Sequence, residues 1–202
     1  MFHPQPIALR GHHVDLEPLA DSHLSDLFEL GQEPEIWSFL SGTPFLSMRD
    51  AEAWLRKALD GQLKAGDVPF AVIDRTSGKA AGTTRYVDIR PVHRGLEIGS
   101  TWYGGPYRRT PVNTETKLML LSHAFENLGA LRVQFQTDSR NVRSQKAIER
   151  LGATREGVLR QHKVCSDGYV RDSVVYSITA TGWPEVKNGL EALLALSGRA
   201  DR

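Results

Sequence analysis

The chain has 202 residues, one cysteine and a formal net charge of +1, with 25 lysines and arginines against 24 aspartates and glutamates. One cysteine excludes a disulfide framework and a cysteine-rich zinc site, and the balanced charge gives no general attraction to nucleic acid or membranes. No apolar run approaches the roughly 18 residues of a membrane span, and the first residues show no targeting pattern. We expect one cytoplasmic domain over residues 1–202.

The first half of the chain predicts a strand, two helices and a series of antiparallel strands. The strand is expected within residues 7–17, and a first helix begins near Asp21. A second helix follows Ser47, which resembles a capping box with Asp50, and Gly66 ends it. An aromatic-rich loop separates the two helices. Short alternating segments then indicate strands at residues 69–74, 80–89 and 95–103.

The second half alternates helices and strands. Leu118, Leu121, Phe125 and Leu128 form a helical stripe that ends at Gly129. A strand over 132–137, a helix capped by Asn141, a hairpin of 158–164 and 169–178 around Ser166, and a C-terminal helix at about 184–197 follow. This order predicts an α/β (α+β) fold, in which helices cover both faces of a mixed, mostly antiparallel sheet.

The segment from Glu97 to Glu115 predicts an anion site. A strand ends in a short basic loop, and the loop leads into the N-terminus of a helix. Free backbone N–H groups, the helix dipole and the charges of Arg108 and Arg109 all favour a phosphate or diphosphate there. The alternative interpretation is a loop that is basic by chance.

Gly99 interrupts the strand before this loop. Glycine inside a strand often marks a bulge or a close approach of another backbone, so the strand is expected to bend and diverge from its parallel neighbour at 132–137. The gap would suit a ligand with amides and a diphosphate, such as coenzyme A. The alternative is that Gly99 only accommodates a bulky neighbour such as Trp102.

Asn141 and Ser144 begin the next helix and could face the gap, or could form a plain cap with a surface serine.

Taken together, the EIGSTW strand, YRRTPVNTE, the segment FENLGALRVQFQTDSRNVRSQKAIERLGATREG and the late GYVRDSVVYSI segment resemble the GNAT superfamily of acetyl-CoA-dependent N-acetyltransferases. The likeness covers nearly the whole chain and is nearest to the RimJ/RimL branch of ribosomal-protein N-terminal acetyltransferases. It implies the GNAT fold with a splayed parallel strand pair, and acetyl transfer from acetyl-CoA to a primary amine. The cofactor-binding residues that it implies are Ile98, Gly99, Ser100, Thr101, Trp102, Tyr103, Arg108, Arg109, Thr110, Val112, Asn113, Thr114, Asn141 and Ser144.

The sequence departs from the family pattern in two respects. The phosphate-binding motif carries Pro111, which lacks an N–H donor, and Asn113 in place of a small residue. Many members also have a tyrosine that protonates the departing thiolate, and Ile148 stands at that position. Ser144 is then the nearest candidate acid.

Direct attack by the amine needs a base for its proton, and Glu97 is the candidate. Its alternative role is a solvated or ion-paired strand residue. Trp37, Phe39 and Tyr86 are candidate acceptor-site residues, with core packing as the alternative. A metal site at His12, His13 and Asp15 is not expected, because adjacent strand residues point to opposite faces.

The expected partner is a small-molecule amine or a protein N-terminal amine, without nucleic acid or membrane, and the C-terminal helix either seals the core or supports a homodimer. Three rival functions stay open: an acyltransferase for another acyl-CoA or for antibiotics or polyamines, a CoA-binding module that has lost catalysis, and a structural interaction protein.

Overall fold

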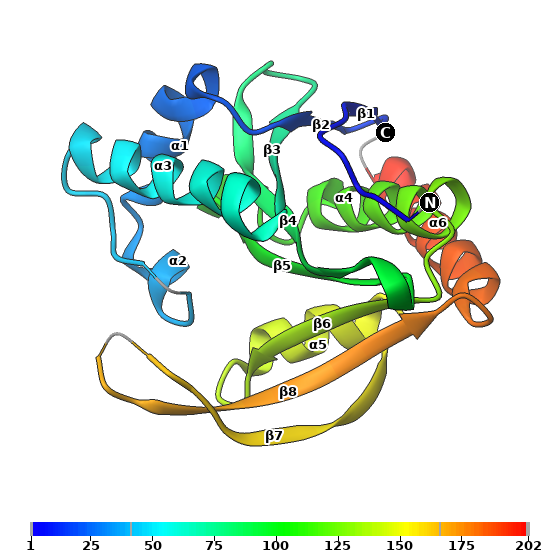
Figure 1. The fold of residues 1–202 in the computed structure, drawn as a ribbon. Coiled ribbons are helices and arrows are strands. Elements are labelled where there is room, and N and C mark those ends of the chain that lie inside the picture. Colours follow the sequence, from blue (N-terminus) through cyan, green and yellow to red (C-terminus); the bar gives the residue numbers. More distant parts are fainter. Residues whose placement is uncertain (1, 41, 166, 201–202) are drawn as a thin grey trace.

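The computed structural model describes residues 2–40, 42–165 and 167–200. One eight-stranded sheet runs through the protein (Figure 1), and its strands lie in the spatial order β1-β2-β3-β4-β5-β6-β8-β7. All neighbours are antiparallel except β5 and β6, which are parallel. The strands are β1 (Leu9–Arg10), β2 (Val14–Pro18), β3 (Val68–Asp74), β4 (Ala80–Arg90), β5 (Gly95–Tyr103), β6 (Arg132–Asp138), β7 (Thr154–Val164) and β8 (Val170–Thr179).

Helices cover both faces of this sheet, which confirms the expected fold class. One apolar core joins the sheet to α4, α5 and α6, and a second core joins the other face to α1, α2 and α3. The helices are α1 (Leu24–Gly31), α2 (Pro34–Trp37), α3 (Met48–Ala65), α4 (Pro111–Ser122), α5 (Val142–Arg150) and α6 (Trp183–Ala200). No helix in the described ranges is long and apolar enough to span a membrane.

Local signals set several of the helix ends. The Ser47 N–H and hydroxyl both bond Asp50 Oδ2, at 2.8 and 3.0 Å, so the predicted capping box begins α3. Gly66 ends α3 in the left-handed region, with φ of +71°, where a residue without a Cβ is favoured. Asn141 Oδ1 accepts the Ser144 N–H at 3.0 Å and caps α5 as predicted.

Three elements differ from the prediction. The single strand expected at residues 7–17 is the β1–β2 hairpin, and α2 lies inside the expected aromatic loop. The first helix is entered through a 3-10 turn with Ala20, rather than Asp21, at its N-cap. The predicted hairpin turn includes Ser166, and that residue lies outside the described ranges.

The C-terminal helix seals the core. Trp183 and Leu190 of α6 are buried, the Trp183 ring stacks on Phe125 with centroids 5.3 Å apart, and α6 lies beside α4 (Figure 1). The homodimer stays a prediction.

Candidate active site

The parallel strands β5 and β6 separate soon after they begin. They pair only at Gly95–Arg132, Leu96–Val133 and Glu97–Gln134, although β5 continues to Tyr103 and β6 to Asp138. Beyond Glu97, the edge of β5 that faces β6 therefore has no ladder partner there. The divergence expected from the sequence is confirmed, and it leaves backbone groups of β5 open to a ligand that can hydrogen-bond like a strand.

A β-bulge bends β5 within the diverging part. Thr83 and Arg85 of β4 are two residues apart, whereas their partners Trp102 and Gly99 are three apart, so β5 holds one extra residue. The left-handed residue is Ser100, with φ of +49°, and not Gly99. Glycine at position 99 instead avoids crowding, because a Cβ there would lie 3.2 Å from Glu97 Oε1 and 3.4 Å from Val87 Cγ2.

Side chains along this part of β5 point to one or the other face of the sheet, so several of them do not face the gap between β5 and β6. Ile98 and Trp102 are buried in the two apolar cores, and Tyr103 packs against the core that contains α4. These three predicted cofactor-binding residues can therefore offer only backbone groups. Ser100 and Thr101 lie at the bulge itself, where the backbone direction changes.

The turn before α4 presents free donors. Thr110 is the N-cap, its Oγ1 accepts the Val112 N–H at 3.3 Å, and its hydroxyl bonds Tyr107 O at 2.7 Å. The backbone N–H groups of Arg109, Thr110 and Asn113 find no acceptor among the described residues. Arg109 is exposed and left-handed, with φ of +62°. Several unpaired N–H groups at a helix N-terminus are a donor set that fits a diphosphate.

Pro111 and Asn113 weaken this donor set less than the sequence indicated. Pro111 occupies the first helical position, where a backbone N–H would have no partner within the helix and the fixed φ of proline is suitable. The Asn113 N–H is still free. Thr114 is buried, and its Oγ1 lies 3.4 Å from the Arg150 side chain of α5.

Arg108 does not join these donors. Its guanidinium bonds Glu33 at 2.8 Å and Glu35 at 3.2 Å, and its Nε donates to Tyr103 O at 3.1 Å. Its charge is thus matched by two carboxylates, Glu33 beside α2 and Glu35 within it, and its role at a phosphate site stays a prediction. Arg109 has no such ion pair among the described residues.

The start of α5 borders a pocket of about 330 Å³ opposite the α2 region. Asn141 lines it; its Oδ1 caps the helix, and its amide nitrogen, which has no partner among the described residues, can donate to a ligand. Ser144 is half-buried one turn on. The pocket is lined by Glu35, Ser38, Phe39, Arg140, Asn141, Val142 and Arg143.

Glu97 lies where the two strands separate. Its Oε2 accepts the Gln134 side-chain N–H at 3.2 Å across the last parallel pair. Burial raises the pKa of Glu97 above its ordinary value, and the hydrogen bond from Gln134 opposes the rise in part. A carboxylate whose pKa is shifted toward neutrality suits a general base.

The predicted acceptor residues separate into two groups. Tyr86 is fully buried, and its hydroxyl donates to Leu120 O at 2.6 Å. Trp37 is also buried, donates to Gly31 O at 2.8 Å and packs on Phe45. Both are core residues here, which is the alternative the sequence left open. Phe39 lies at the pocket, 5.8 Å from the Arg140 guanidinium, which stacks at 3.4 Å on Tyr169.

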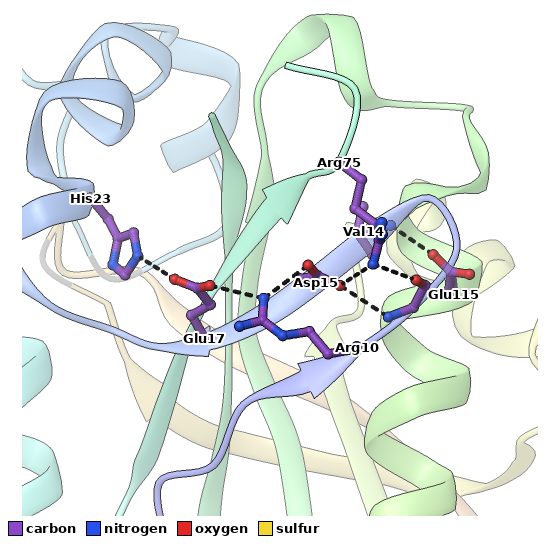
Figure 2. Close-up of polar contacts among 8 residues, drawn as sticks. Arg10, Val14, Asp15, Glu17, His23, Arg75 and Glu115 are labelled. Atoms are coloured by element: carbon purple, nitrogen blue, oxygen red, sulfur yellow. Dashed lines mark hydrogen bonds and ion pairs between the residues drawn. The ribbon is translucent and has the colours of Figure 1, made fainter. Parts of the chain in front are cut away.

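Two charged residues of α4 were missed. Glu115 is buried and accepts the N–H groups of His12, His13 and Val14 at 2.8, 2.6 and 2.7 Å, so it ties α4 to the β1–β2 turn. Figure 2 shows Glu115 and Val14 in this contact. That turn, and not a strand, carries His12 and His13, whose rings lie 4.9 Å apart. Lys117 is buried beneath the β5 bulge. A glutamate and a lysine two positions apart were the available sequence signal, but such residues usually lie on a solvated face.

Comparisons with known proteins agree with this geometry. The family model of the acetyltransferase (GNAT) domain matches residues 13–154. A GCN5-related N-acetyltransferase from Brucella melitensis is 33% identical, with a TM-score of 0.88 over 95% of this chain and 86% of that one. A protein from T. thermophilus that is assigned to the acetyltransferases is 43% identical, with a TM-score of 0.83 over 95% and 98% of the two chains.

A further solved structure is similar in fold alone. Spermidine N-acetyltransferase from Vibrio cholerae, in complex with CoA and spermine, is 18% identical, with a TM-score of 0.68 over 85% of this chain and 98% of that one. The matched family model and the two closer structures settle the classification: the chain belongs to the GNAT family of acetyltransferases, whose members use acetyl-CoA.

Proposed function

We propose that this protein transfers an acetyl group from acetyl-CoA to a primary amine by direct attack of the amine. The observation that carries the proposal is the divergence of β5 from β6 after Glu97, combined with the bulge at Ser100. A plain parallel pair would have no free backbone edge in this position. Family membership supports the class of reaction, and the divergence of β5 from β6 supports this part of the sheet as the site of the reaction.

The chain offers the groups that coenzyme A needs. The free N–H groups of Arg109, Thr110 and Asn113 would hold the diphosphate, and the charge of Arg109 adds to the attraction. The open edge of β5 would pair with the pantetheine amides, with the Asn141 amide opposite. When bound, acetyl-CoA supplies the activated acetyl thioester.

Proton handling is assigned to two side chains. Glu97 would accept the proton of the attacking amine, directly or through water. A backbone N–H at the bulge, near Ser100 or Thr101, would stabilise negative charge on the acyl oxygen. The Ser144 hydroxyl is the candidate donor toward the thiol, because Ile148 is apolar and buried.

For the acceptor, we propose an α-amine, as in the RimJ/RimL branch. An α-amine has a pKa of about 7.7–8.0 and a lysine-type amine about 10.4, so the α-amine needs less help to lose its proton. The pocket lined by residues of α2 and α5 includes Arg140 and Asn141, which follow the end of β6, and it would receive the residues that follow such an amine.

The test is a matrix of acyl-CoA thioesters against peptides with free N-termini, N-acetylated peptides that retain a lysine, polyamines and aminoglycosides. Thiol release and product mass are both measured. The proposal predicts thiol release with acetyl-CoA and modification of the free N-terminus. Turnover of another class would replace the acceptor, and CoA binding by calorimetry without any turnover would favour a non-catalytic CoA-binding module.

A further inference from the structure

We infer that Lys117 is a positioning residue, whose amine holds the β5 bulge in its working shape through the hydroxyls of Thr84 and Thr101. This inference rests on the proposed function, since the bulge matters only if acyl transfer takes place there. Lys117 does not reach the reacting atoms. It acts from α4 through Thr101, the residue that follows Ser100.

The three side chains form a closed triangle. Lys117 Nζ lies 2.7 Å from Thr101 Oγ1 and 3.1 Å from Thr84 Oγ1, and the two hydroxyl oxygens are 2.7 Å apart. Thr84 lies on β4 within the register shift, and Thr101 lies on β5 beside left-handed Ser100. The triangle therefore joins α4 to both strands at the place where β5 carries its extra residue.

Counting donors and acceptors indicates which form of the amine fits. A neutral amine has two N–H groups, and the two threonine oxygens accept them. One threonine hydroxyl can then donate to the other, and the Thr101 hydroxyl can also reach Gly99 O at 3.4 Å. An ammonium group has a third N–H, for which the described residues provide no acceptor. No carboxylate in the described ranges forms an ion pair with Lys117. Burial alone lowers the pKa of Lys117 to about 7.

A buried lysine without an ion pair lowers the stability of the folded protein. Lys117 is 5% exposed, and lysine is almost never fully buried without a charged partner. Burial of an amine costs a desolvation free energy that an apolar residue of the same length would avoid. A residue that weakens the fold while it fixes a strained segment fits the trade-off between stability and activity seen at functional sites.

The tyrosine and carboxylate side chains nearest in sequence to the triangle on β4, β5 and α4 are Tyr86, Tyr103 and Glu115. Tyr86 on β4 and Tyr103 on β5 have pKa values raised by burial, so both stay protonated. Glu115 on the same helix is bound to the His12–Val14 backbone. Protonation of Lys117 would add an unsatisfied N–H and loosen the triangle, so the rate would fall as the pH falls through about 7.

The test compares Lys117→Met, Thr84→Val and the control Thr116→Val. Methionine keeps the length of the side chain and removes the amine. Thr84→Val removes one hydroxyl of the triangle and serves as the test if Lys117→Met does not fold. Thr116 is buried on the same helix and has no part in the triangle. We expect Lys117→Met to lower kcat roughly ten- to a hundredfold, with KM for acetyl-CoA within about twofold and Tm unchanged or raised. Thr84→Val should lower kcat in the same direction, and Thr116→Val should leave it unchanged.

Isotope-labelled lysine gives a readout independent of turnover. The 13Cε signal that disappears in Lys117→Met should titrate near pH 7 in the wild type, while the other lysines titrate near 10. A Lys117 signal that titrates near 10, or wild-type kcat in Lys117→Met, would overturn the inference. Absence of acetyl transfer in the wild type would instead defeat the proposed function, and the titration would still report whether the amine is held neutral.

Discussion

Glu97→Gln tests whether the carboxylate at the strand divergence is the base. The substitution keeps the shape of the side chain, and its amide oxygen can still accept the N–H of Gln134, 3.2 Å away in the wild type. A positioned general base contributes about 10²–10⁴-fold, which at 1.36 kcal/mol for each tenfold corresponds to about 2.7–5.4 kcal/mol of transition-state stabilisation. We expect kcat/KM for the amine to fall by that factor, with unchanged affinity for CoA.

Two neighbours predict shifts of opposite sign in the acid limb of the pH–rate profile. Activity needs ionised Glu97, so it rises as the pH rises through the Glu97 pKa. Gln134 lowers this pKa by donating a hydrogen bond, and Asp88 raises it by charge repulsion. Gln134→Leu should therefore move the limb to higher pH, and Asp88→Asn should move it to lower pH.

The assay is thiol release at saturating acetyl-CoA from pH 5 to 9, with calorimetry as the control for CoA binding. To separate Glu97 from Lys117, the profiles are repeated in the Lys117→Met protein, which removes the contribution of Lys117 and leaves those of Glu97 and the acceptor amine. Wild-type rates for Glu97→Gln at every pH, or equal shifts for Gln134→Leu and Asp88→Asn, would remove Glu97 as the base.

Four further variants test other parts of the structure. Arg109→Ala should weaken CoA binding about three- to tenfold by calorimetry, because one charge near a helix N-terminus contributes roughly 1 kcal/mol. Arg108→Ala should mainly lower Tm, since its partners are Glu33 and Glu35; equal losses of CoA affinity in both variants would contradict this division. Glu115→Gln should lower the free energy of unfolding by about 2–4 kcal/mol in urea titrations, because three backbone N–H groups, one of them buried and two partly buried, lose a charged acceptor, whereas the exposed Glu52→Gln should change little. Tyr86→Phe should cost about 1 kcal/mol through its bond to Leu120 O, and a neutral result would mean that the hydroxyl is not held there.

Local chemistry made much of the framework predictable from the sequence. The capping box at Ser47, the left-handed end at Gly66 and the cap at Asn141 depend on residues within one or two turns of each other, so they could be recognised without the fold. The bounds of β5 at residues 95 and 103 agree with its alternating pattern and flanking turns. The divergence from β6 was also predictable, because a glycine inside a strand followed by a helix start is a local signal.

The tertiary structure decided which side chains are available for chemistry. Arg108 resembles a free cation in the sequence, but its partner Glu33 lies 75 residues earlier and meets it only in the folded protein. Tyr86 and Lys117 lie in patterns that suit either an exposed or a buried face, and only the packing of α4 against the sheet buries them both. Caps and turns are set by neighbours in sequence, whereas burial and ion pairing depend on segments brought together by folding. The sequence by itself therefore determined where most of the strands and helices begin and end, and the packing of α2 and α4 against the sheet determined which charges face the gap.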